Sequence, residues 1–229
     1  MNIRHTRFTR PALGALCVAT LAMLQACNGD ACFGVDVCFN NNTQTVSLSG
    51  TAATGSALAS ASVAVSCAIG SATTLTDGGG NYQVTVNAAL PCVITVTSGG
   101  TSLHSLAYAG GTFNTTPETE LMLVYLAAQL GTNTAGLIGN FQGNLHFQQV
   151  MDSPNAVQAA QSAVVTNLQQ RYAVTLTTPA FLTTSFVVGQ PGIDSDLGAL
   201  AKAGAIDSNG FPDPVAISLL TQAGAAHPL

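Results

Sequence analysis

The sequence contains no tryptophan, few other aromatic residues and very little charge. Charged residues make up 7% of the 229 residues, against about 25% in a typical soluble protein. Beyond residue 10 the only basic side chains are Arg171 and Lys202, against ten acidic ones. A chain with this excess of acidic side chains repels the phosphate backbone of nucleic acids, which argues against nucleic-acid binding. Hydrophobic residues still reach 47%, which excludes a disordered chain and allows a sizeable core.

Residues 1–26 have the layout of an export signal. Three arginines lie within the first ten residues, and an almost wholly apolar run follows from 11 to 26. A basic head with about 15 apolar residues is typical of a secretory signal, and the run is shorter than the ~20 residues that span a bilayer. No later segment is long and apolar enough to span. The sequence therefore predicts export and no membrane helix in the mature chain.

The apolar run ends in Leu24-Gln25-Ala26-Cys27, which resembles the lipobox of bacterial lipoproteins. The resemblance implies cleavage after Ala26, acyl chains such as palmitate on Cys27, and anchoring in a membrane. Several chains on one residue anchor stably, because each buried methylene contributes about 0.8 kcal/mol. Asn28 follows the cysteine, and similarity to Gram-negative lipoproteins then implies the outer membrane. The alternative is a secretory signal cut elsewhere, with Cys27 as an ordinary thiol.

The remaining cysteines of the exported chain are even in number, which predicts two disulfides. They are Cys32, Cys38, Cys67 and Cys92. We expect the pairs Cys32–Cys38 and Cys67–Cys92 among the three possible pairings. Cys67 continues the alternation of Val63 and Val65, and Cys92 shares a face with Ile94 and Val96, so both point into one core.

Period-two alternation marks the region that follows a tether at residues 27–43. Glycines separate its short apolar runs, which is the signature of strands. We expect strands at 44–49, 61–68, 72–76, 81–87, 92–97 and 102–108. This spacing predicts an antiparallel β-sandwich over residues 44–111.

A family resemblance agrees with this prediction. Ser49-Gly50-Thr51-Ala52 and the turn from Thr76 to Tyr82 (T-D-x-x-G-N-Y) are similar to the carboxypeptidase regulatory-like domain, a prealbumin-type sandwich. The resemblance implies an accessory, non-catalytic fold. The sandwich followed by N-T-T-P-E-T-E-L, Asn114 to Leu121, also resembles β-proteobacterial lipoproteins that have no established activity.

Residues 112–229 change to a helical period, and the whole chain is expected to be α+β: the sandwich, then a small all-helical region. Thr116-Pro117-Glu118 supplies a cap, a first-turn proline and an acid, and the helix should end at Gly131. A weaker helix is expected over 133–150 and a better one from Ser153-Pro154 to Tyr172. Further helix starts are expected at Thr178-Pro179, near Asp194, and at Asp213-Pro214.

Residues 207–213 begin like a calcium loop, but the bidentate Glu that completes such a loop is missing. Asp213 is explained as a helix cap. A cation at Asp194, Asp196, Asp207 or Asp213 is left open, and we expect no metal and no cofactor. His104 and His146 would form a pair only if folding brought them together, and Glu118 and Glu120 face different ways on a helix. No G-x-S-x-G elbow is present.

These residues predict an outer-membrane lipoprotein that acts as a non-catalytic binding or structural module of the cell envelope. Its partners would be the membrane, through the lipid on Cys27, and an envelope protein or glycan. Two alternatives remain: a metal-dependent envelope hydrolase using Asp194, Asp196 or Asp207, and a surface-displayed adhesin or assembly subunit.

Overall fold

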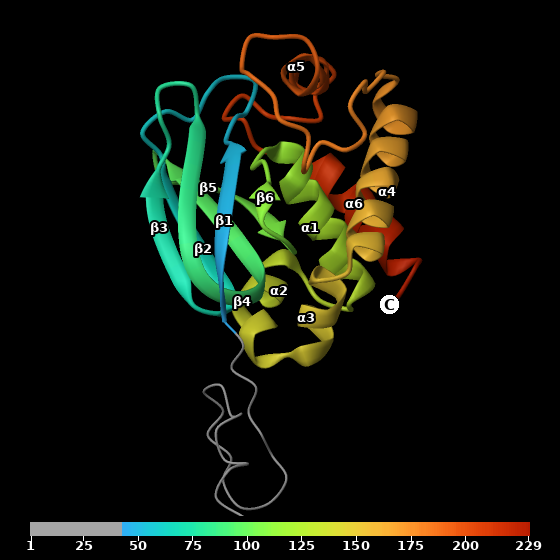
Figure 1. The fold of residues 1–229 in the computed structure, drawn as a ribbon. Helices are drawn as coiled ribbons and strands as arrows, with labels where there is room; N and C mark the ends of the chain where they lie inside the picture. The colour runs from blue at the N-terminus through green and yellow to red at the C-terminus, as the bar shows by residue number, and fades with distance from the viewer. Residues whose placement is uncertain (1–42) are drawn as a thin grey trace, which may run out of the picture. The chain divides into compact units, whose positions relative to one another are not determined.

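The computed structural model describes residues 43–229, which combine strands and helices in an α+β arrangement. Strands come first in the chain and helices follow (Figure 1). The lipobox, Cys27, Cys32, Cys38 and the tether lie outside the described residues.

The strands form a six-stranded, mostly antiparallel sheet with the order β3-β2-β4-β1-β6, and β5 also pairs with β4. Their bounds are β1 (Gln44–Thr51), β2 (Ser62–Ile69), β3 (Ser71–Leu75), β4 (Asn81–Ser98), β5 (Thr101–Ala107) and β6 (Gly111–Thr112). In β1, β2 and the first half of β4, buried residues largely alternate with exposed ones, as the sequence pattern predicted. The turn between β3 and β4 is organised by Asp77, whose Oδ1 accepts the backbone N–H groups of Gly79 and Asn81.

The expectation of separate strands at 81–87 and 92–97 was wrong, because both belong to the 18-residue strand β4. Its first half pairs with β1, from Asn81 to Ala88, and its second half pairs with both β2 and β5. Pro91, which has no N–H to donate, lies where the partners change. No glycine falls between the halves to form a turn, so the strand continues past the proline.

The helices follow the sheet in the order α1 (Pro117–Gln129), α2 (Thr134–Asn140), the 3₁₀ turn η1 (Phe141–Gly143), α3 (Leu145–Met151), α4 (Pro154–Tyr172), α5 (Ile193–Lys202) and α6 (Pro214–Ala225). Predicted caps are present at Thr116, Ser153 and Asp213, each accepting a backbone N–H of the first turn. The weak helix expected over 133–150 is three short elements, consistent with its glycines.

Helix α1 lies at the centre of the fold that residues 43–229 form. It contacts β5 of the sheet and also helices α4 and α6, which lie on the side of α1 that faces away from the sheet (Figure 1). Eleven of its thirteen residues are buried. The sequence predicted only an apolar stripe, and the difference arises because the helix is covered on several sides. At one crossing Gly224 of α6 lies against α1 so closely that an added Cβ would come within 2.4 Å of the Tyr125 carbonyl oxygen.

The helix start expected at Thr178-Pro179 was also wrong, because residues 179–184 form turns only. Their backbone groups are taken by side chains from elsewhere. Gln161 of α4 accepts the N–H of Leu182, and Asn114 donates to the carbonyl oxygens of Phe181 and Thr184. A helix would need these same groups for its own hydrogen bonds.

Candidate functional site

The connector, residues 114–120, comprises the segment that leads from the sheet to α1 and the first turn of α1 itself, and it is almost completely buried. Asn114 is its main polar tie: its Oδ1 accepts the N–H of Thr51 at the end of β1, while its Nδ2 donates to Phe181 and Thr184. Thr116 and Thr119 form a reciprocal capping box at the start of α1. Most of this segment, which carried the lipoprotein resemblance, therefore has a structural role in the folded chain.

Glu118 is the unusual residue of the connector. Its side chain is 1% exposed, and neither carboxyl oxygen has a hydrogen-bond partner among the described residues. Burial, with a smaller contribution from the charge of Asp196, raises the pKa of Glu118 to about 8. The group is therefore mostly protonated at neutral pH, as expected for a buried carboxyl without a partner among the described residues.

The neighbouring Glu120 points elsewhere, as the sequence predicted for residues two apart on a helix. One of its oxygens lies 2.8 Å from the ring nitrogen Nδ1 of His104 and also accepts the backbone N–H of His104. This pair ties α1 to β5. His104 is thus held by a carboxylate of α1, while His146 lies in the first turn of α3.

The four aspartates considered for a cation have separate backbone partners. Asp196, buried in α5, accepts the N–H groups of Thr177 and Thr178, and Asp194 accepts that of Gly189. Asp213 caps α6 by accepting the N–H of Val215. Within residues 43–229, no three His, Cys, Asp or Glu side chains gather as a metal site would require.

Asp207 organises a tight loop between α5 and α6. Its Oδ1 accepts the N–H groups of Asn209 and Phe211, and its Oδ2 has only a 3.5 Å contact with the amide of Asn209. The hydrogen bond from Phe211 is the main reason that the pKa of Asp207 lies below its usual value. The side chain therefore stays anionic and keeps one oxygen almost free.

This loop forms one wall of an open groove of about 660 Å³, which we call the loop groove. The other walls are the 54–58 loop after β1, the β4–β5 turn and one face of α5. Its volume lies within the roughly 300–1,000 Å³ typical of ligand sites. The polar lining side chains are Thr54, Ser56, Ser98, Thr101, Asp207, Ser208 and Asn209, and the larger apolar ones are Leu58, Leu103 and Phe211.

Gly210 holds the two loops of the groove together. It has a φ of +79°, and a Cβ added there would come within 2.4 Å of the Thr54 side chain. Residues more than 150 positions apart thus meet at van der Waals distance. In the sequence, residues 207–213 begin like a calcium loop, but no spacing indicates that this loop lies against Thr54.

Three further findings bear on the expected envelope role. The predicted Cys67–Cys92 disulfide is present, linking β2 to the second half of β4.

Among the described helices, no single one is long and apolar enough to cross a membrane, although α1 and the stretch after it pass that test together as a sharply bent pair. No protein-family model, no curated protein and no solved structure matches this chain.

Proposed function

We propose that the chain is an outer-membrane lipoprotein, anchored through Cys27, that acts as a non-catalytic binding module of the cell envelope. The main support for the proposal is the loop groove, a preformed hollow between loops of the sheet on one side and α5 with the loop after it on the other. The three aspartates of the hydrolase alternative, Asp194, Asp196 and Asp207, instead accept separate backbone N–H groups. The lipobox resemblance supports the anchor.

The proposal includes a prealbumin-type arrangement of the strands. Its support is the division of β4. The first half of β4 pairs with β1, which in turn pairs with β6, and the second half pairs with β2 and β5. Because β4 is shared, these two groups of strands can face each other across a common core.

The anchor is tested by the intact mass of the full chain extracted from membranes and alkylated without reduction. We expect a mass that begins at Cys27, carries acyl chains and has no alkylated thiol. No thiol will be alkylated if Cys32 and Cys38 form a disulfide, as Cys67 and Cys92 do. An unlipidated chain that begins elsewhere would contradict the anchor.

The binding role is tested by asking whether the loop groove is occupied in the cell. Ser208, exposed in the groove, and Ser162, exposed on α4, are each changed to cysteine. We expect N-ethylmaleimide to label Ser208→Cys severalfold more slowly in whole cells than in the purified full chain, because a bound partner covers it. Ser162→Cys should react alike in both. Labelling of Ser208→Cys at the same rate in cells and in the purified chain would overturn the proposed function.

A further inference from the structure

The loop groove combines hydroxyl, amide and carboxylate groups with an aromatic ring. The hydroxyls of Thr54, Ser56 and Ser208 have no hydrogen bond within the described part of the chain, so they can form hydrogen bonds with a ligand. Phe211 is half-buried and contributes an apolar face to the same hollow. A few polar groups around an apolar surface are the usual makeup of a small-molecule site.

The charge of the groove narrows the class of ligand. Asp207 is the one charged side chain among the described lining residues, and no basic residue accompanies it. A phosphate, sulfate or carboxylate ligand would meet an anion without a compensating cation, inside an acidic protein. A divalent cation would find a single carboxylate, one of whose oxygens already accepts two backbone N–H groups.

We infer that the loop groove binds a neutral saccharide. Sugar hydroxyls can donate to the open Oδ2 of Asp207 and exchange hydrogen bonds with the Thr, Ser and Asn side chains, while an apolar sugar face packs on Phe211. The inference rests on the proposed binding function and names the ligand class of the same site. It involves no bond making or breaking.

The absence of tryptophan makes the site easy to observe. Phe211→Trp places a single indole in the groove of the full chain, purified in a detergent without a sugar headgroup. We expect its fluorescence to change on titration with a neutral hexasaccharide from a panel of maltohexaose, cellohexaose and chitohexaose. Calorimetry with the unmodified chain should show the same binding. Fully sulfated maltohexaose, the charged counterpart, should bind at least tenfold more weakly.

Asp207→Asn is the deciding variant, because its Oδ1 can still accept the loop N–H groups while the anionic Oδ2 becomes an amide. We expect about tenfold weaker saccharide binding, since a charge-assisted hydrogen bond is lost. Ser162→Ala on α4 is the matched control and should bind as the unmodified chain does. Unchanged affinity in Asp207→Asn, or no binding by any neutral probe, would overturn the inference. Slow labelling of Ser208→Cys in cells would meanwhile still support a binding module with another ligand.

Discussion

Replacing Glu118 by Gln is expected to abolish the pH dependence of stability that the raised pKa of Glu118 predicts for the unmodified protein between about pH 5 and 8. The carboxyl has a raised pKa of about 8 in the folded chain, against an ordinary value of 4.5. Between these values the folded chain holds a proton that the unfolded chain has lost, so stability falls as the pH rises and levels off above about 8. The slope for one proton is about 1.4 kcal/mol per pH unit.

The measurement is the free energy of unfolding in urea at several pH values. Thr119→Val, one residue away, is the matched control. It removes the hydroxyl that accepts the N–H of Thr116 and donates to the carbonyl oxygen of His104, and it should lower stability by a similar amount at every pH. It should therefore keep the slope that Glu118→Gln loses. A slope that persists in Glu118→Gln would show that another group takes up the proton.

The second large effect is expected from removing the Cys67–Cys92 disulfide. Changing both Cys67 and Cys92 to Ala should lower the free energy of unfolding by about 3–4 kcal/mol, because the bond closes a loop across a separation of 25 residues and restricts the unfolded chain. Substitution is preferable to a reductant, since the predicted Cys32–Cys38 pair would respond as well. Urea unfolding measures the change.

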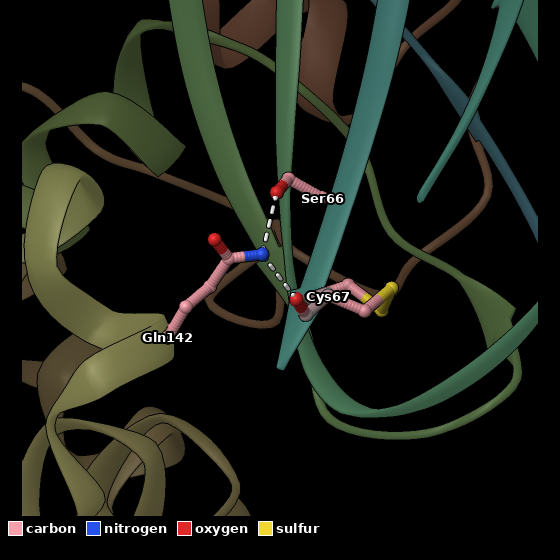
Figure 2. The surroundings of a disulfide bond; sticks show 4 residues. Ser66, Cys67 and Gln142 are labelled. Carbon is pink, nitrogen blue, oxygen red and sulfur yellow. Dashed lines mark hydrogen bonds between the residues drawn. A yellow bond between two sulfur atoms is a disulfide. The ribbon is translucent and has the colours of Figure 1, made fainter. Parts of the chain in front are cut away.

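Gln142→Ala provides the comparison at the same place. Figure 2 shows the Gln142 side chain, which comes from η1, donating to the carbonyl oxygen of Cys67 and the hydroxyl of Ser66. These bonds lie near the surface, and their loss should cost only about 1 kcal/mol. A double cysteine variant no less stable than Gln142→Ala would contradict the loop-closure account.

Much of the chain's local structure was predictable, because its signals are local. Alternation placed most strands, and the caps at Thr116, Ser153 and Asp213 placed three helix starts. Cys67 and Cys92 pair directly across β2 and β4, as their shared face predicted. The expected division into two strands failed at β4, where a proline interrupts hydrogen bonding without turning the chain.

The features that were missed depend on contacts between distant segments. A helix start at Thr178-Pro179 has correct local chemistry, but Asn114 and Gln161 take the backbone groups that it would use. Glu118 looks like an ordinary first-turn acid, and only the tertiary fold buries it. The loop groove likewise exists because Thr54 and Gly210 meet, and no spacing in the sequence records that encounter.

The tight crossing of α6 on α1 sets an order of events during synthesis. Helix α1 is made early, yet part of its apolar surface is covered only by α6, which follows after α2 to α5. Until Gly224 and its neighbours have been translated, nothing from α6 can shield that surface. The helical half therefore completes its core only when its last helix has been made, so this packing forms after the rest of the described chain has been synthesised.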